Sequence, residues 1–306
     1  MSLPPILRFF LFALFSSLLL VASAARAWQA VDDRGVVVSG EAVPVRIVSL
    51  LPSLTETVCA LGACERLVGV DRYSDWPASV ARLPKLGGGI DPQIESIVAL
   101  KPDLVLIATS ARAGTRLRAL GLTVLALEPK QYADVQRVLA VIGSVLGLPA
   151  SRAEQLWTQM QLDVAQHALP ATLPALLPAG SARKVRVYVE VNAAPYGAGE
   201  ASFMGETLKR IGADNIIPVS LGAFPKLSPE FVVRANPDVI MLGRDDEGRA
   251  TGDGVDALAK RPGWQSIAAI QSRRVCRFTA EESNVLVRAG PRMAQGARLM
   301  ADCLRR

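Results

Sequence analysis

The chain of 306 residues carries 34 lysines and arginines against 28 aspartates and glutamates, a formal net charge of +6. Without residues 1–27, which hold two arginines and no acid, the charge is +4, and the roughly 280 residues that remain are enough for two domains with ordinary cores. So small an excess, with no basic run interleaved with aromatic residues, argues against a nucleic-acid partner and is typical of a charge that serves solubility or attracts anionic ligands.

Residues 1–27 are a predicted secretory signal peptide. Arg8 precedes an apolar run at residues 9–21, and the Ala-Arg-Ala sequence at 25–27 fits a small-x-small cleavage site. The run is too short for a comfortable membrane span, and no other stretch approaches the roughly 20 apolar residues that a span needs. Because the first cysteine, Cys59, lies far from this segment, we predict a protein of the periplasm that has no lipid anchor.

After a polar lead at residues 28–45, strands and helices alternate through an N-terminal lobe that we place at residues 45–148. Ser53 or Thr55 is the expected cap of the first helix, which ends near Gly62. The other predicted helices are residues 92–100, 112–120 and 132–146, and the predicted strands are residues 45–50, 67–70, 104–108 and 122–127. This alternation predicts a parallel sheet with helices on its faces, and such sheets bind ligands beyond the carboxyl ends of their strands.

A single long helix follows at residues 149–170. Leu156, Met160 and Val164 recur at helical spacing, Ser151 is an expected cap with Glu154 three residues later, and Pro170 ends the helix. The only histidine, His167, lies on this segment, where a structural role is favoured over metal binding or acid–base work. Residues 170–180 contain three prolines and are interpreted as a surface connector.

The C-terminal lobe, residues 183–306, repeats the plan of the first. Its predicted strands are residues 185–190, 215–218, 238–242 and 274–278, and its predicted helices are residues 205–211, 229–235, 255–260 and 290–303. Residues 95–107 match residues 230–242 at a constant spacing of 135, including a shared Pro-Asp dipeptide between helix and strand. The repeat predicts two lobes of similar topology with the long helix as a strut between them.

Export to an oxidising compartment permits disulfides among the four cysteines. We expect pairing within lobes, Cys59 with Cys64 and, more strongly, Cys276 with Cys303. Four cysteines allow three connectivities, and the spacing alone leaves all three open.

Five stretches, at residues 46–56, 68–77, 94–105, 262–264 and 288–292, resemble the periplasmic substrate-binding proteins of ABC importers that have one rigid linker helix. This class III group of periplasmic binding proteins carries cobalamin, haem and ferric siderophores. The resemblance implies an α/β fold of two Rossmann-like lobes, each a mainly parallel sheet flanked by helices. It also implies a monomer that delivers a small molecule to an inner-membrane ABC permease and its ATPase.

The Tyr-Ser-Asp-Trp-Pro loop at residues 73–77 is most similar to the cobalamin-binding members, although residues 87–89 are glycines where those members have a tryptophan. We therefore expect a corrinoid as the transported ligand, with haem or a ferric siderophore as the alternative, and no resident cofactor. Such flat ligands favour aromatic contacts that lose little entropy. The candidate ligand-binding residues are Tyr73, Trp76 and Gly88 of the first lobe and Tyr196, Phe224 and Arg288 of the second.

Each candidate also has a structural interpretation. Trp76 could simply pack its loop, Phe224 could cover the core, Arg288 could be a solvated surface residue, and Gly88 could serve only a turn. The resemblance further implies that Glu95 and Glu230, matched by the repeat, bind arginines of the two permease subunits. An acidic residue in a first helical turn is also favoured by the helix dipole, so both roles are compatible.

The main rival is an enzyme on a similar frame, such as a tetrapyrrole metal chelatase. A single histidine, no zinc-type spacing of cysteine and histidine, no phosphate-binding loop and no nucleophile elbow argue against it. We therefore expect no catalytic residue, no metal site and no enzymatic activity.

Overall fold

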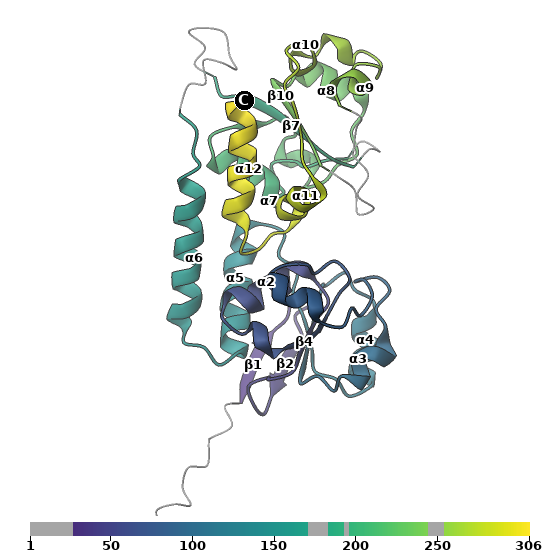
Figure 1. Cartoon of the computed structure of the whole chain (residues 1–306), viewed down its shortest axis with the longest axis vertical. Helices are drawn as coiled ribbons and strands as arrows, with labels where there is room; N and C mark the ends of the chain where they lie inside the picture. Colours follow the sequence, from purple (N-terminus) through teal and green to yellow (C-terminus); the bar gives the residue numbers. More distant parts are fainter. Residues whose placement is uncertain (1–26, 171–182, 193–195, 244–253) are drawn as a thin grey trace, which may run out of the picture.

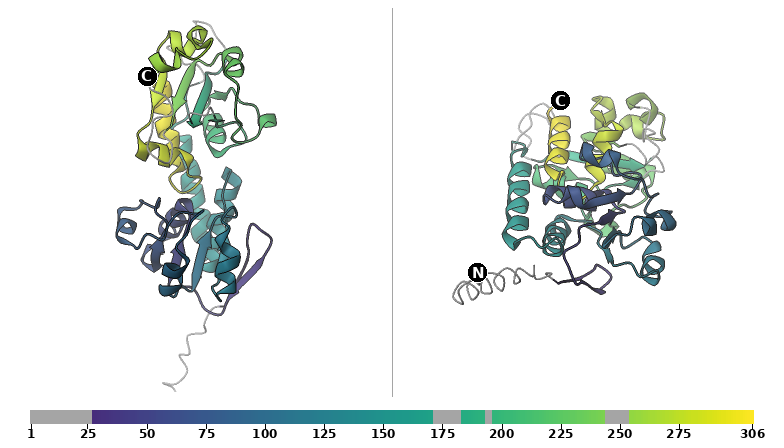
Figure 2. Two further views of the ribbon diagram at one scale, coloured as in Figure 1. Left: turned by 90° about the vertical axis from the view of Figure 1, so that its right-hand side faces the viewer. Right: turned by 60° about the horizontal axis from the view of Figure 1, so that its bottom comes forward.

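The computed structural model describes residues 27–170, 183–192, 196–243 and 254–306. The predicted signal peptide up to residue 26, the connector from residue 171 and the polar segment at 244–253 lie outside these described residues. Two lobes are stacked along the long axis of the molecule, the N-terminal one below and the C-terminal one above (Figures 1 and 2). Helix α6 (Ala150–Ala165) runs along one side of both.

The N-terminal lobe, here lobe one, contains a parallel sheet in the order β4-β3-β5-β6. Its strands are β3 (Ile47–Ser49), β4 (Leu67–Val70), β5 (Leu104–Ile107) and β6 (Val124–Ala126). Its helices are α2 (Pro52–Ala60), α3 (Ile94–Ala99), α4 (Ala113–Ala119) and α5 (Tyr132–Val145), with short 3-10 turns η1 (Cys64–Arg66) and η2 (Ala78–Arg82). All of the strands and helices predicted for this lobe are confirmed, with ends that shift by a few residues.

The C-terminal lobe, lobe two, is built around β7 (Arg186–Asn192), which pairs in parallel with β9 (Asp214–Asn215) and β10 (Val239–Leu242). β10 pairs in parallel with β11 (Val275–Arg277), and the short β8 (Tyr196–Gly197) is antiparallel to β7. The helices are α7 (Phe203–Arg210), α8 (Pro229–Ala235), α9 (Val255–Leu258), α10 (Ala268–Gln271), α11 (Ala280–Val287) and α12 (Met293–Arg305), with 3-10 turns η3 (Val219–Leu221) and η4 (Trp264–Ser266).

The internal repeat is confirmed down to single backbone angles. Lys101 and Asn236, 135 positions apart, both adopt a positive φ, 46° and 43°, at the helix-to-strand turn. The aspartates of the two Pro-Asp dipeptides act alike: Asp103 accepts from the backbone N–H of Arg46 and Asp238 accepts from that of Arg186, each at 2.9 Å. Each carboxylate thereby fixes the start of the first strand of its lobe, which explains why the dipeptide occurs twice.

The two lobes share one hydrophobic core. The largest cluster of buried side chains includes Leu54 of α2, Leu139 of α5, Met160 of α6, Leu208 of α7 and Met300 of α12. Because α6 packs against α5 of lobe one and against α7 and α12 of lobe two, it is a strut, as predicted, that is also buried into both lobes. Both expected disulfides, Cys59–Cys64 and Cys276–Cys303, are present and tie elements within each lobe.

The predicted caps of two helices are wrong. Ser53 and Thr55 lie inside α2, which begins after Leu51 with a proline in its first turn. Ser151 lies inside α6, whose cap position is Pro149. In both helices proline supplies the start, because its fixed φ suits the first turn or its flank and no side-chain cap is then needed.

The polar lead, for which no element was predicted, forms a β-hairpin of β1 (Trp28–Val31) and β2 (Val37–Gly40). Its turn is built by Asp32, whose carboxylate accepts from the backbone N–H groups of Arg34 and Val36, and by Gly35 at φ 76°. Such a short polar–glycine turn signal was available in the sequence. Helix α11, with a Thr279 capping box, was also not predicted.

Candidate functional site

The strands of both parallel sheets end at the boundary between the lobes. The segment after β4 reaches Arg288 of lobe two, and the segment after β6 accepts a hydrogen bond at Lys130 O from the backbone N–H of Phe203 in lobe two, at 3.1 Å. Carboxyl ends of parallel strands are the usual place for ligands in α/β folds.

The four predicted aromatic ligand contacts are the most exposed aromatic side chains of the described part of the chain. Tyr73 is 45% exposed, Trp76 38%, Tyr196 38% and Phe224 51%. The remaining described aromatic residues are buried or only partly exposed. Two large aromatic side chains from each lobe are thus left open to water, and groups of exposed apolar side chains favour an interaction site.

In lobe one, Tyr73 and Gly88 lie against each other. A side-chain carbon added at Gly88 would stand 3.4 Å from Cε2 of Tyr73 and 2.7 Å from Oδ1 of Asp91. The backbone N–H of Gly88 donates to Asp91, which is also paired with Arg72. Gly88 therefore lets the Tyr73 ring and the Asp91 turn approach closely. This is a structural role beside a ligand candidate, whereas the sequence suggested either a ligand contact or a turn.

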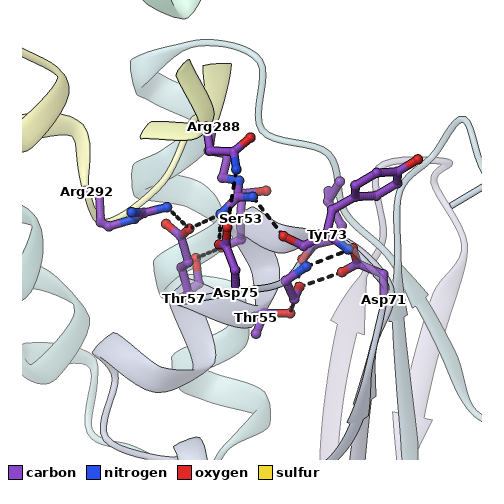
Figure 3. A network of polar contacts seen from close by, with 12 residues as sticks. Ser53, Thr55, Thr57, Asp71, Tyr73, Asp75, Arg288 and Arg292 are labelled. Carbon is purple, nitrogen blue, oxygen red and sulfur yellow. Dashed lines mark hydrogen bonds and ion pairs between the residues drawn. The ribbon is translucent and has the colours of Figure 1, made fainter. Parts of the chain in front are cut away.

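The backbone at Tyr73 is held by Asp71, which has no exposed surface. Its carboxylate accepts from the N–H of Tyr73 at 2.8 Å and from the N–H and hydroxyl of Ser74 at 3.1 and 2.5 Å. Burial raises the pKa of Asp71, and the hydrogen bonds from Ser74 and Tyr73 oppose that shift only in part. The Tyr73 turn is thus rigid, while its ring extends away from these contacts (Figure 3).

In lobe two, Tyr196 and Phe224 come from neighbouring segments. Tyr196 forms an antiparallel bridge with Lys226, and the N–H of Gly199 donates to the carbonyl of Ala223 at 2.9 Å. The β8 segment and the loop that carries Phe224 are therefore one paired unit. The structure brings the two lobe-two candidates together on that unit.

Trp76 lies at a cavity between the lobes of about 360 Å³. This cavity is lined by Asp75, Trp76 and Ala78 of lobe one and by Glu281, Glu282, Val285, Arg292 and Gln295 of lobe two. The guanidinium of Arg292 stands 5.3 Å from the centre of the Trp76 indole. Trp76 therefore already has a cationic partner on one side, whereas no such partner from lobe two lies over Tyr73 in the described part.

Arg288 is not the solvated residue of the structural interpretation but the centre of an ion cluster across the boundary. Its Nη1 donates to Glu56 Oε1 at 3.1 Å and to Asp75 Oδ1 at 2.6 Å, and its Nη2 donates to the carbonyl of Tyr73 at 2.8 Å. Arg292 Nη2 also donates to Glu56 Oε1, at 2.6 Å. Figure 3 shows both arginines reaching from lobe two onto lobe one. A direct contact of Arg288 with ligand stays a prediction.

The cluster is largely shielded from water. The Glu56 side chain is 1% exposed and that of Arg288 7%, while Asp75 is half exposed at 51%. Among the described residues, Glu56 Oε2 is a buried oxygen without a hydrogen-bond partner. Removing one partner of a buried ion pair typically costs about 3–5 kcal/mol, because the other charge is left uncompensated.

The pKa of Asp75 is lowered. Partial burial alone would raise it, but the hydrogen bond and charge of Arg288, with a smaller contribution from the charge of Arg292, outweigh burial. Asn284 of lobe two donates to the other oxygen of Asp75 at 3.2 Å. Asp75 is therefore a stable anion that belongs to lobe one and is bound by lobe two.

Sequence reasoning missed Glu56, Asp75, Arg292, Asn284 and Asp71. A weak signal existed for Glu56, which lies in the middle of the short helix α2 among residues that are mostly apolar or small, where a charge requires a partner. Nothing local in the sequence names that partner, since Glu56 and Arg288 are 232 positions apart.

The predicted docking carboxylates occupy matched places. Glu95 and Glu230 lie in the first turns of α3 and α8, and both are exposed. In Figure 1, α3 and α8 lie on the side of the molecule away from α6. Backbone and Ser228 hydrogen bonds lower the pKa of Glu230, and Glu95 is 3.3 Å from the exposed Arg116. Two exposed carboxylates, one per lobe, suit recognition by a partner with two basic sites.

No group of three or more His, Cys, Asp or Glu side chains within the described residues is placed to hold a metal ion. No helix among them is both long enough and apolar enough to pass through a bilayer.

Comparisons with known proteins agree with this architecture. The sequence profile described as periplasmic binding protein matches residues 47–282. The ABC transporter substrate-binding lipoprotein YvrC of Bacillus subtilis is 32% identical over 271 residues, which cover 85% of this chain and 80% of that protein. The vitamin B12-binding protein of Pectobacterium atrosepticum is 28% identical over 208 residues, 66% of this chain and 72% of that protein.

Among solved structures, a periplasmic haem-binding protein from Roseiflexus in its apo form superposes with a TM-score of 0.69 at 26% identity. The superposition covers 85% of this chain and 97% of that one. The match thus spans both lobes and the linker helix.

Proposed function

The chain belongs to the periplasmic binding protein family, and on that premise we propose that it captures a corrinoid between its lobes and delivers it to an inner-membrane ABC permease. It is a substrate-binding protein of an ABC importer, in the group that carries vitamin B12, haem and siderophores. The corrinoid, the residues that hold it and the docking carboxylates are our proposal.

The exposed aromatic side chains carry this proposal. Tyr73 and Trp76 of lobe one and Tyr196 and Phe224 of lobe two are open to water, whereas the other described aromatic residues are buried or only partly exposed. A corrinoid offers wide apolar faces and a polar rim of amides, so rings from both lobes bury its faces while nearby polar groups meet its edge. Gly88 lets the Tyr73 ring and the Asp91 side chain lie close against the backbone of this turn.

Binding requires no chemistry by the protein. Asp71 of lobe one and Arg288 of lobe two both bind the backbone of Tyr73, so the turn that carries the ring is ordered before ligand arrives. Pre-ordered side chains lose less entropy on binding, which favours affinity. The shared core of the two lobes keeps the lobe-two aromatic residues at a set distance from those of lobe one.

Titration separates the candidate ligands. Purified mature protein is titrated by calorimetry with cyanocobalamin, haemin and a ferric hydroxamate. We expect one-to-one binding of cyanocobalamin that is much tighter than that of the other two. Tight binding of haemin or the hydroxamate with none of cyanocobalamin would overturn the corrinoid proposal and leave the importer role in place.

Haem is the second candidate ligand, because Tyr73 and Tyr196 both present phenol groups that could serve as axial ligands to iron. A haem bound through tyrosine would give an absorption spectrum that changes when that tyrosine is replaced by phenylalanine. A corrinoid held by stacking alone would tolerate the same Tyr→Phe changes with little loss of affinity.

A further inference from the structure

We propose that Arg288 is a positioning residue that holds the ligand-binding turn of lobe one from lobe two, so that the Tyr73 ring is correctly placed only while the lobes are in contact. This inference rests on the proposed function, since it takes Tyr73 to be a ligand contact. Separation of the lobes would then dismantle the lobe-one half of the site together with the boundary.

Arg288 binds directly to the segment that carries the Tyr73 ring. It ends α11 and binds the carbonyl of Tyr73 itself and the side chain of Asp75 two residues later, at 2.8 and 2.6 Å. Asn284, one helical turn earlier, binds the other Asp75 oxygen. These three contacts from lobe two bracket the segment at residues 73–75, which carries the Tyr73 ring.

Lobe one holds this turn at the N–H of Tyr73 and at Ser74, whose carbonyl accepts from Lys85 Nζ at 2.5 Å. Asp71 fixes the N–H of Tyr73 and Ser74, and the hydroxyl of Ser74 lies 2.9 Å from that of Thr55 in α2. Among the described residues, Arg288 is the hydrogen-bond partner of the Tyr73 carbonyl, and Arg288 and Asn284 of lobe two bind the carboxylate of Asp75. The turn is therefore completed only by a residue of the opposite lobe.

The lobes do not depend on Arg288 to stay together. Tyr132 of α5 donates its N–H to Glu206 at 2.6 Å, and its hydroxyl lies 3.0 Å from that of Thr207, both in α7. The buried core also continues through α6. A role confined to joining the lobes would be redundant, whereas Arg288 is the lobe-two residue that binds both the Tyr73 carbonyl and Asp75.

The test compares Arg288→Lys with Tyr132→Phe in the mature protein. Lysine keeps the charge beside Glu56 but has no planar fork that can reach three acceptors at once. Tyr132→Phe removes a hydrogen bond between the lobes at the other contact, and Thr207 keeps its bond to the carbonyl of Phe203 at 2.9 Å. The control thus weakens the boundary without touching the Tyr73 turn.

Amide hydrogen exchange in the ligand-free protein is the first readout. We expect faster exchange in residues 71–77 for Arg288→Lys and wild-type exchange there for Tyr132→Phe. Unchanged exchange in Arg288→Lys, or equal loosening in Tyr132→Phe, would overturn the proposal. If Arg288→Lys does not fold, Asp75→Ala replaces it, because Asp75 is half exposed and its loss leaves Glu56 paired with Arg288 and Arg292.

A double-mutant cycle with cyanocobalamin as the probe is the second readout. Arg288→Lys is expected to lower affinity about tenfold in the wild-type background, the usual consequence of losing a charged hydrogen bond. It is expected to have little further effect when Tyr73 is already alanine, because the two residues act through one turn. Additive losses would contradict the proposal. Failure of the wild type to bind cyanocobalamin would instead overturn the ligand assignment, and hydrogen exchange would still decide the role of Arg288.

Discussion

Ser53 of lobe one and Gly290 of lobe two touch across the boundary: a Cβ on Gly290 would stand 3.5 Å from the Cβ of Ser53. This separation lies in the range of about 3.5–4.5 Å that disulfides require. Ser53 is in the first turn of α2 and Gly290 lies between α11 and α12, beside the ion cluster of Arg288. The boundary is thus close enough for a covalent lock.

The pair Ser53→Cys with Gly290→Cys is expected to form a disulfide between the lobes. Closing so long a loop stabilises a protein by roughly 2–5 kcal/mol, which raises the melting temperature of the oxidised form. Because the lock preserves the observed contact, cyanocobalamin binding is expected to be unchanged. Import in reconstituted vesicles is expected to be lost if delivery requires the lobes to part. Each single cysteine variant is the control, and normal import by the locked form would contradict a need for separation.

Alanine substitution of Tyr73 or Tyr196 is expected to lower ligand affinity roughly tenfold, through lost stacking and buried ring area. The matched control is Leu162→Ala on α6, an apolar residue that is 55% exposed and lies outside both aromatic groups. Calorimetry measures all three variants. Wild-type affinity in both tyrosine variants would remove them from the site.

Glu95→Ala combined with Glu230→Ala is expected to leave ligand affinity unchanged and to abolish uptake, because both carboxylates are exposed and lie in the first turns of α3 and α8. Glu65→Ala, an exposed glutamate of lobe one, is the control and is expected to import normally. Affinity and vesicle uptake are measured side by side. A loss of affinity in the double variant would place these glutamates in the pocket instead.

The contribution of Asp75 to stability is expected to depend on pH with a defined sign. Its pKa in the folded protein is depressed below the ordinary 3.8, so its ionised form is stabilised by folding. The stabilisation is fully present above that ordinary pKa and is lost as the pH falls through the lower folded value. The difference in melting temperature between wild type and Asp75→Asn is therefore expected to be constant from pH 8 to about pH 5 and to shrink below pH 3.8. Because Asp75 is half exposed, high salt is expected to reduce the difference.

Ligand binding is expected to change the overall shape very little. The continuous helix α6 and the core shared by α5, α7 and α12 resist a wide hinge motion. Small-angle scattering of free and bound protein is expected to give the same radius of gyration within error. A clear contraction on binding would show that the shared core yields more readily than its packing indicates.

Much of the fold was accessible from sequence because it is encoded locally and twice. Hydrophobic periodicity located α5 and α6, and the Pro-Asp dipeptides marked the same turn in both lobes, where the structure has Lys101 and Asn236 at matching positive φ. The hairpin β1–β2 was missed because its turn was read as part of a polar lead. The caps were wrong where a proline near the helix start made a serine or threonine unnecessary.

The candidate site also has a part that the sequence predicted and a part that it did not. Exposure of Tyr73, Trp76, Tyr196 and Phe224 agrees with the sequence interpretation, although Tyr196 lies in the short strand β8 rather than in a loop. The roles of these residues in binding remain predictions. The cluster around Arg288 could not be foreseen, because its members are separated by more than 200 positions and none carries a local sequence signal for its partner.

By itself, the sequence determined that this protein has two repeated α/β lobes, one long helix between them and aromatic side chains in the loops at the strand ends. Spacing along the chain encodes such features, because helices, strands and turns depend on near neighbours. Only the tertiary structure decided that Glu56, Asp75 and the Tyr73 carbonyl meet the guanidinium of Arg288. A buried charge is satisfied by whichever opposite charge folding brings within about 3 Å, and that choice is made in space rather than along the chain.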